Sequence, residues 1–389
     1  MLSVILNKNE EIEKLKGFPW VFNNEVNSFE GNIVNGSVCK VLTIDKKFVG
    51  YGFLNTSSKI MVRILSLDEE DVIDKEFFKK RILLAIEHRQ NLGFFSTCTR
   101  LIFSEADFLP GLVVDKYGDY LSVSFMSLGM DKIKKDIIDI LVEELKPKGI
   151  YERSDMPVRE KEGLPLFKGA IYSEFNPRVM VTENDIKFIV DLENGQKTGY
   201  FLDQKLNRDI MKLYAKDKVV LDCFSNVGGF ALHACKYGAK EVTACDISRL
   251  ACDDIMNNAR LNDFNQLKAV CVDVFDFLRN PENDNKYDVI VLDPPAFTKD
   301  KSTIKKAYKG YKEINVRAMK IIKSGGYLLT FSCSQHMTPD LFMQMVNDAA
   351  IDSKRKVQFL DFKVQSPDHP ALLSSNEQLY LKCMILRII

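Results

Sequence analysis

The fold is decided by residues 218–248, which read KVVLDCFSNVGGFALHACKYGAKEVTACDIS. This pattern predicts a strand, a tight turn, a helix and a second strand. The apolar run VVL is typical of a strand covered on both faces, and Gly228 and Gly229 allow a sharp turn into an Ala-rich helix. The second strand, predicted over residues 241–245, places Asp246 at its carboxyl end, where open α/β sheets bind their ligands. The segment is therefore predicted to be a nucleotide-binding βαβ unit.

The glycine turn and its acids favour a cationic nucleotide that lacks phosphate. A spacing of about 20 residues between the glycines and Asp246 is typical of an acid that binds ribose hydroxyls. A dinucleotide site uses G-x-G-x-x-G to bring backbone amides to a pyrophosphate, whereas this turn has only two adjacent glycines. Asp222, at the mouth of the first strand, would repel a phosphate. We expect S-adenosylmethionine, with Asp222, Gly228 and Gly229 near its methionine part and Asp246 on its ribose; the alternative is a βαβ unit that binds nothing.

Length and composition limit the classes of protein that the chain can be. Its 389 residues predict two or three domains, and 46% hydrophobic with 28% charged residues is an ordinary globular composition. The formal net charge is zero, so any polyanion has to be held by a local patch and not by a protein-wide field. Nonspecific nucleic-acid binding is therefore disfavoured, whereas a specific RNA site is not.

The cysteines, the histidines and the amino terminus indicate a cytoplasmic protein. Nine scattered cysteines without C-x-x-C pairing suggest neither a disulfide framework nor a zinc site, and the histidines show no metal spacing. No signal peptide or membrane-spanning stretch is recognisable, so we expect a soluble protein that is not exported. We expect burial for Cys223, Cys235, Cys245, Cys252, Cys271 and Cys383, and helix-surface or loop positions for His88, His233, His336 and His369, of which His336 and His369 could reach the site.

Three segments are predicted along the chain. Residues 1–72 alternate in strand-like runs and suggest a small β-barrel or sandwich, in which the single Trp, Trp20, is expected to be a core anchor more than a base-stacking platform. Residues 73–185 predict a central α+β domain. Within it the charged stretch 151–160 is either the lining of a cleft or a solvated loop. Residues 186–389 alternate strand and helix, which predicts a doubly wound parallel sheet closed by an antiparallel edge pair.

Three strand ends downstream of the glycine turn carry chemistry-bearing side chains. Asp273 follows the third strand and either lies beside the adenine or caps the next short helix. Two prolines stop the fourth strand and present Asp293 and Phe297 as a platform for a planar base. Cys333 ends the fifth strand, after the glycine-containing turn 324–326, and is placed to be a nucleophile.

Together these motifs resemble a known family. The strings GQKTGYFLDQKLNR, VLDCFSNVGGF, DPPAF, FSCS and DHPALLSSNEQLYLKC are similar to those of the bacterial 23S ribosomal RNA 5-methylcytidine methyltransferases, the large-subunit group with an amino-terminal PUA domain. The strings GFPWVF, EADFLPGLVVDKYGDYL and YERSD extend the resemblance over essentially the whole chain. One departure is that the position after the strand-four prolines offers Ala296 and Phe297 instead of a second cysteine, which leaves the base that removes the carbon 5 proton unassigned.

The resemblance implies a PUA RNA-binding domain, the family's own α+β insert and a class I methyltransferase domain, in a homodimer that acts on 23S ribosomal RNA. It also implies an S-adenosylmethionine-dependent cytosine-5 methyltransferase. The expected catalytic residues are Cys333 and Asp293; the cofactor site comprises Asp222, Phe224, Gly228, Gly229, Asp246 and Asp273; the substrate site comprises Phe297, Pro294, Gln204 and Lys197; and no metal is expected.

Two alternatives to that function stay open. A methyltransferase that acts on a base amino group or another base position would use the same cofactor site and need only DPPAF, which would make Cys333 a bystander. A non-catalytic RNA-binding assembly factor would keep the amino-terminal domain and a vestigial cofactor fold. Covalent trapping on 5-fluorocytidine RNA would distinguish the cytosine-5 mechanism from the first alternative. Measurable cofactor turnover would exclude the second.

Overall fold

The computed structural model describes residues 2–95, 98–298, 300–375 and 378–389. The chain divides into two compact units that interleave in sequence. The first unit comprises Met1–Val181, Val190–Leu202 and Pro367–Gln378, and the second comprises Thr182–Ile189, Asp203–Ser366 and Leu379–Ile389. Within the described residues, no helix combines the length and the apolar character needed to cross a membrane.

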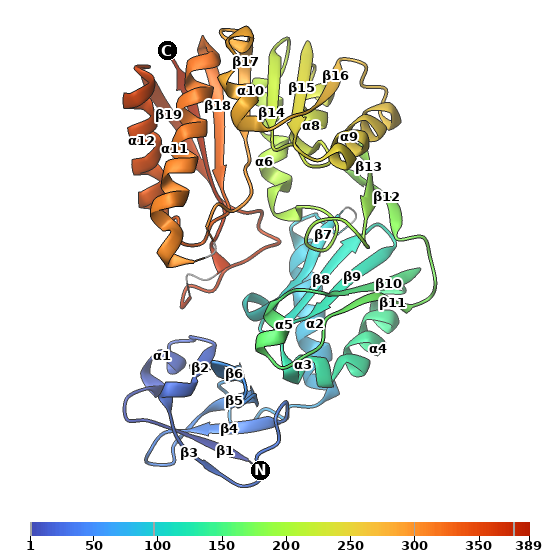
Figure 1. Cartoon of the computed structure of the whole chain (residues 1–389). Helices are drawn as coiled ribbons and strands as arrows, with labels where there is room; N and C mark the ends of the chain where they lie inside the picture. The colour runs from blue at the N-terminus through green and yellow to red at the C-terminus, as the bar shows by residue number, and fades with distance from the viewer. Residues whose placement is uncertain (1, 96–97, 299, 376–377) are drawn as a thin grey trace. The chain divides into compact units, whose positions relative to one another are not determined.

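The amino-terminal part of the first unit is a six-stranded sheet with the order β2-β6-β5-β4-β1-β3 (Figure 1). Neighbouring strands are antiparallel except β1 and β4, and alternate residues of β4 are buried, as the period-2 pattern predicts. Trp20 stands outside the buried core of this sheet, half-buried and edge-on to Phe18 and Phe22, so the prediction of a core anchor is wrong. The elements are β1 (Ser3–Leu6), α1 (Glu11–Leu15), β2 (Trp20–Phe22), η1 (Asn23–Glu25), β3 (Val26–Glu30), β4 (Val38–Leu42), β5 (Phe48–Leu54) and β6 (Ile60–Ser66).

The central part of the first unit is a five-stranded sheet with the order β11-β10-β9-β8-β7. β8 pairs antiparallel with both β7 and β9, and helices α2 and α4 contribute to the core. The elements are α2 (Lys75–Asn91), β7 (Thr99–Phe103), η2 (Ser104–Asp107), β8 (Leu112–Tyr117), β9 (Tyr120–Phe125), α3 (Leu128–Lys132), α4 (Lys134–Leu145), β10 (Gly149–Ser154), α5 (Val158–Lys161) and β11 (Phe167–Tyr172). A separate two-stranded sheet joins β12 (Arg178–Glu183) to β13 (Ile186–Asp191).

The first part of the charged stretch 151–160 is a buried strand, so the interpretation as a solvated loop is wrong for residues 151–154. Every residue of β10 is buried. Glu152 accepts a hydrogen bond from Lys134 Nζ at 2.9 Å, and Arg159 pairs with Asp131 at 2.9 Å. Because Glu152 and Arg159 each have an oppositely charged partner inside the unit, the cost of burying them is offset without solvent.

A buried arginine connects the amino-terminal sheet to the central sheet. Arg63, on β6, lies 2.7 Å from Glu105 Oε1 and 2.9 Å from Glu162 Oε1, and all three side chains are nearly inaccessible. Trp20 Nε1 also donates to Glu105 Oε1, at 2.9 Å. These contacts fix β6 against η2 and against the end of α5.

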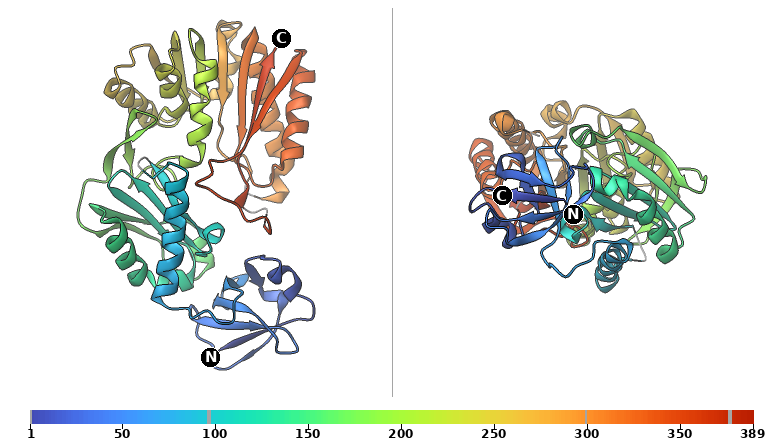
Figure 2. Two further views of the ribbon diagram at one scale, coloured as in Figure 1. Left: turned by 180° about the vertical axis from the view of Figure 1, so that it is seen from behind. Right: turned by 90° about the horizontal axis from the view of Figure 1, so that it is seen from below.

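The second unit contains a seven-stranded sheet with the order β16-β15-β14-β17-β18-β20-β19. The first five strands in this order are parallel, and β20 is antiparallel to both neighbours, which confirms the predicted doubly wound sheet with an antiparallel edge pair. Figure 2 shows β18, β20 and β19 side by side from behind. The strands are β14 (Val219–Cys223), β15 (Glu241–Asp246), β16 (Leu267–Cys271), β17 (Tyr287–Leu292), β18 (Ile322–Ser332), β19 (Val357–Lys363) and β20 (Lys382–Ile388).

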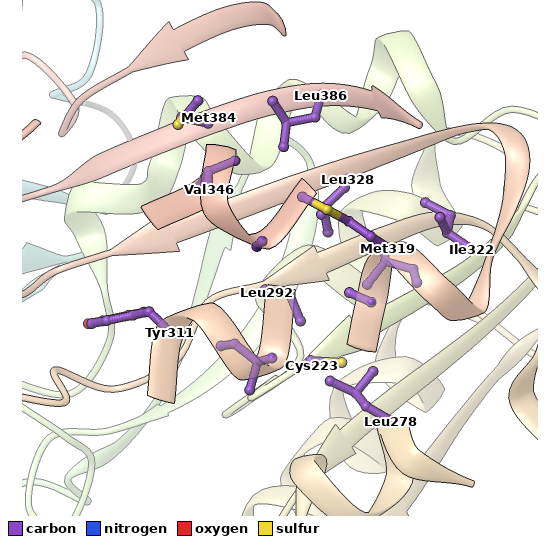
Figure 3. Packing of buried hydrophobic residues seen from close by; sticks show 14 of the residues in the cluster. Cys223, Leu278, Leu292, Tyr311, Met319, Ile322, Leu328, Val346, Met384 and Leu386 are labelled. Atoms are coloured by element: carbon purple, nitrogen blue, oxygen red, sulfur yellow. The ribbon is translucent and has the colours of Figure 1, made fainter. Parts of the chain in front are cut away.

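The helices of this unit bury apolar side chains against the sheet. Figure 3 shows Tyr311, Met319 and Val346 packed over Leu292 and Leu328, and all of these side chains belong to one buried cluster. The helices are α6 (Lys205–Asp209), α7 (Met211–Tyr214), α8 (Gly229–Lys236), α9 (Arg249–Leu261), α10 (Val274–Arg279), α11 (Ile304–Ile321) and α12 (Pro339–Ser353), with the short turns η3 (Leu202–Gln204), η4 (Pro281–Asn283) and η5 (Lys301–Thr303).

The predicted turn at 324–326 lies inside β18 and not before it. Tyr287 of β17 pairs with Ile322, but Val289 pairs with Tyr327, so β18 carries extra residues over the same length of β17. Gly325 has a φ of 83°, which accommodates the bulge because glycine has no Cβ. The chain therefore begins to pair with β17 immediately after α11 ends.

Candidate active site

The loop after β14 is a run of left-handed residues that turns the chain into α8. Phe224, Asn226 and Gly228 have φ values of 62°, 53° and 91°. A Cβ on Gly228 would make only ordinary contacts, 3.4 Å from Ile255 and Leu232, so it is the left-handed φ that favours glycine there. Gly229 is the first residue of α8, as predicted. This loop is a backbone cradle at the carboxyl end of the sheet, where open α/β sheets bind ligands.

Asp222 is the buried acid at the base of this cradle. Its Oδ2 accepts from Ser225 Oγ at 2.5 Å and from the Ala231 amide at 3.0 Å. Its Oδ1 is buried and has no hydrogen-bond partner within the described part of the chain. Burial raises the pKa of Asp222 to about 7. One oxygen thus holds the loop while the other is left to a ligand.

Asp246 ends β15 on the other side of the cradle. Its Oδ2 accepts from the Asn226 amide and its Oδ1 from the Ser248 amide, both at 2.9 Å. The side chain is half-buried, and the next residue, Ile247, is 71% exposed. Asp246 therefore braces the glycine loop and also presents carboxylate oxygens at the rim of the sheet.

Asp273 has the geometry of a helix cap. It is exposed, it is the N-cap of α10, and its Oδ1 accepts from the Phe275 amide at 2.7 Å. The capping interpretation is therefore confirmed. The contact of the Asp273 carboxylate with the adenine stays a prediction.

The residues of the cradle fit S-adenosylmethionine. The buried, unpartnered Asp222 Oδ1 would accept from an ammonium group, and a carboxylate here suits a cation better than a phosphate. Asp246 offers acceptors for a ribose diol.

The Asp293 side chain is held in place by the side-chain amide of Gln204, the residue that precedes α6. Asp293 directly follows β17, is half-buried, and accepts from Gln204 Nε2 at 3.0 Å. Gln204 is itself buried, and its Oε1 accepts from Asn207 Nδ2 at 2.7 Å. Gln204, predicted as a substrate-binding residue, is thus brought directly to the predicted catalytic acid.

Cys333 lies beside the strand-four prolines. It follows β18, which pairs with β17 up to Leu292 and Thr330, so the two strand ends are neighbours as predicted. The Cys333 Sγ is 3.9 Å from the Pro294 carbonyl oxygen, and the side chain is half-buried. The thiol, the Pro294 carbonyl and the Asp293 carboxylate therefore share one edge of the sheet.

Phe297 packs into the second unit more closely than a free stacking platform would. Its ring centroid lies 4.5 Å from that of Tyr311 and 6.2 Å from that of Phe275. A Cβ on Gly310 of α11 would lie 3.2 Å from the ring, so the glycine makes room for it. The ring is half-buried, and base stacking by Phe297 stays a prediction.

Lys197 belongs to the first unit, where it is exposed with its Nζ 4.7 Å from the Phe201 ring.

Sequence reasoning missed three residues next to Cys333. Tyr311 Oη is 2.8 Å from Ser334 Oγ, and Lys382 Nζ donates to the Ser334 carbonyl at 2.7 Å. A lysine among the apolar residues of the terminal stretch YLKCMILRII was the available signal, because such a stretch is typical of a strand in a sheet interior.

Two predictions for cysteine and histidine burial are wrong. Cys271 is exposed, because it is the last residue of the outermost strand β16. His233 is fully buried on α8, where Nδ1 lies 2.7 Å from the Gly229 carbonyl and burial lowers its pKa to about 4. His369 is also buried and belongs to the first unit, where its Nδ1 is 2.9 Å from Asp368 Oδ1.

Comparison with known proteins agrees with this geometry. The profile of the S-adenosylmethionine-dependent methyltransferases matches residues 173–382, and that of the PUA-like domain matches residues 4–67. A Streptococcus mutans protein described as a SAM-dependent methyltransferase has the same fold over 100% of both chains, with a TM-score of 0.83 at 21% identity. A methyltransferase solved as a complex with SAH has a TM-score of 0.84 at 22% identity, also over 100% of both chains.

Curated relatives match over the full length of the chain. The ribosomal RNA large subunit methyltransferase I of Aliivibrio fischeri is 39% identical over 100% of both chains. The protein of the same name from Aeromonas hydrophila is 40% identical over 99% of both. With its PUA-like domain, cofactor cradle and strand order, the chain therefore belongs to the S-adenosylmethionine-dependent methyltransferases, in the family of the ribosomal RNA large subunit methyltransferase I proteins.

Proposed function

We propose that this methyltransferase forms 5-methylcytidine in 23S ribosomal RNA through a covalent bond between Cys333 and the cytosine. The ribosomal substrate is supported by the names of the relatives. The covalent mechanism is carried by one observation: the Cys333 thiol lies at the end of β18, 3.9 Å from the Pro294 carbonyl and beside the strand end that bears Asp293.

Carbon 5 of cytosine is a poor nucleophile, so the ring must first be activated. The Cys333 sulfur adds to carbon 6, and the electrons of the carbon 5–carbon 6 double bond make carbon 5 nucleophilic. Bound S-adenosylmethionine supplies an electrophilic methyl group. After carbon 5 is methylated it loses its proton, the double bond re-forms and the sulfur leaves carbon 6. The base that takes this proton is not assigned.

Asp293 and Gln204 would position the base during this sequence. The Asp293 carboxylate would accept from the amino group of the cytosine and so orient the base while the sulfur adds. Because Gln204 Nε2 donates to Asp293 at 3.0 Å and is itself held by Asn207, the carboxylate is kept in one orientation. Asp222, Asp246 and the Gly228 turn would hold the cofactor.

Trapping on modified RNA tests the nucleophile. RNA that contains 5-fluorocytidine cannot lose the group at carbon 5, so the wild-type enzyme is expected to form an adduct that survives denaturation. Cys333→Ala and Cys333→Ser are expected to bind RNA and cofactor but to form neither the adduct nor methylated product. Cys271→Ala is the matched control, since it removes another solvent-accessible thiol of the same unit. Substantial turnover by Cys333→Ala would refute the covalent mechanism.

Methylation of a base amino group is the second candidate, and a specific contact favours it. The Asp293 carboxylate and the Pro294 carbonyl are two acceptors at one strand end, which is what recognition of an amino group requires. In that case Cys333→Ala keeps its activity, and nucleoside analysis of the product RNA finds the methyl group on nitrogen.

The PUA-like part and a second copy of the chain are the proposed partners of the catalytic unit. We expect the PUA-like part, residues 4–67, to supply part of the RNA affinity. The proposed homodimer rests on the family resemblance. Sedimentation of the free protein at two concentrations checks it, and a monomer at both would contradict it.

A further inference from the structure

A buried lysine next to Cys333 has no role in the mechanism above. Lys382 is the first residue of β20, lies opposite Ser332 of β18 and is 2% exposed. Its Nζ donates to the carbonyl oxygens of Ser334 and Tyr380, each at 2.7 Å. These two bonds fix the amino group immediately beside the turn that carries the candidate nucleophile.

Lys382 lacks the counter-ion that a buried ammonium group needs. No carboxylate in the part of the chain that the structure describes forms an ion pair with it, and an unpaired buried charge is costly. Burial lowers the pKa of Lys382 to about 8, and the neighbouring Cys333 sulfur opposes that shift. The ammonium form is therefore favoured when the sulfur is negative.

Other polar groups around this turn do not replace that counter-charge. Tyr311, on α11, bonds Ser334 Oγ, and burial raises the pKa of its hydroxyl, so it is neutral at physiological pH. Asp293, at the end of β17, is bonded to Gln204. On β20, burial raises the pKa of Cys383, and on β19 Lys363 pairs with Asp361 at 2.8 Å.

We propose that Lys382 is a positioning residue whose ammonium group stabilises Cys333 as a thiolate. The sulfur gives up its proton and the amine holds one, so a thiol and an amine become a thiolate and an ammonium group with no net change in protons. The same charge stabilises the sulfur when it leaves carbon 6. This inference rests on the proposed covalent role of Cys333, but its test does not require RNA.

The test measures how fast iodoacetamide alkylates Cys333 as a function of pH, resolved by peptide mass spectrometry. Lys382→Met keeps the length of the side chain and removes the charge, so the pH midpoint of alkylation should rise by about one unit and the rate near neutral pH should fall about tenfold. Lys382→Arg should restore most of the rate. Lys323→Met, a change at a lysine of β18 that pairs with Asp288 of β17, should leave the profile unchanged. Alkylation of Cys271 in each sample reports general access of the reagent.

An unchanged midpoint in folded Lys382→Met would overturn the inference. Should Lys382→Met fail to fold, the wild-type protein decides: near pH 7 the half-buried Cys333 must react faster than the exposed Cys271, and slower reaction refutes the pairing. The two proposals fail in different ways. Methyl transfer by Cys333→Ala refutes the covalent mechanism. If Cys333→Ala is inactive but the pH midpoint of Cys333 alkylation is unchanged in Lys382→Met, only the role of Lys382 is refuted.

Discussion

At the scale of single residues, Asp222 is the side chain whose charge depends most on what is bound. Its carboxyl is fully buried, one oxygen is bonded twice and the other is unpartnered. Burial raises its pKa to about 7, so the folded protein retains a proton that the unfolded chain loses near pH 4. Stability of the cofactor-free protein should therefore fall as pH rises from about 4 to about 7, and then level off.

Cofactor affinity should show the opposite dependence on pH. A cation beside Asp222 favours the ionised carboxylate, so S-adenosylmethionine should bind tighter at about pH 8 than at about pH 6, by up to about tenfold. Asp222→Asn should bind more weakly and lose this dependence. Calorimetry at both pH values measures it, and S-adenosylhomocysteine, which keeps the ammonium group but lacks the sulfonium charge, should show the same dependence. The same pH dependence in wild type and Asp222→Asn would exclude Asp222 as its source.

Residue-level prediction from sequence succeeded where the signal is local and failed where it is not. The glycine turn and the Asp293-Pro294 pair are read from neighbouring residues, and their strand-end positions follow from sheet topology. The partnership of Lys382 with the Ser334 turn joins residues 48 positions apart, so no local pattern reveals it. His233 was placed wrongly because α8 is buried on nearly all sides, which removes the amphipathic pattern that would have marked a buried face.

At the scale of elements, β6 is tied to the central part of the first unit by Arg63. Replacing Arg63 by Met would leave Glu105 and Glu162 buried without their cation, which should lower the free energy of unfolding by about 3–5 kcal/mol. Urea unfolding followed by circular dichroism measures the loss. Lys46→Met, at an exposed pair with Glu30, is the control and should change stability by less than about 1 kcal/mol.

A loss below about 1 kcal/mol for Arg63→Met would mean that the two glutamates take up protons or water instead. The same contacts bear on any deletion of the PUA-like part. Removal of β6 takes away Arg63 itself, so weakened RNA binding by such a deletion has to be compared with Arg63→Met before it is assigned to lost RNA contacts.

The alternation of strands and helices in the second unit was predicted correctly, but the start of β18 was not. This alternation identified the sheet, and the helix at 339–353 begins with a Thr338 cap and Pro339, residue types typical of a helix start. The glycines after α11 indicated a turn, but they form a bulge because pairing with β17 starts at Ile322. The two glycines in the sequence indicate that the chain can bend there. Where β18 begins to pair depends on β17, which the local sequence does not reveal.

At the scale of the whole molecule, the balanced charge of 54 basic and 54 acidic residues limits how RNA is held. With no protein-wide field, few phosphates are neutralised, and the logarithm of the RNA affinity should fall with the logarithm of salt concentration at a slope no steeper than about −3. Fluorescence anisotropy with a 23S RNA fragment over a salt series gives this slope. A slope steeper than about −6 would show an extended basic surface that the net charge conceals.

The strand order of the second unit has a consequence during synthesis on the ribosome. β20 lies between β18 and β19, yet it follows both of them in the chain. Until β20 has been translated, the facing edges of its two neighbours are left without their hydrogen-bond partner, and open edges invite pairing with other chains. Chains stalled between residues 364 and 381 should therefore be especially prone to aggregate and to need chaperones, whereas one further strand closes both edges at once.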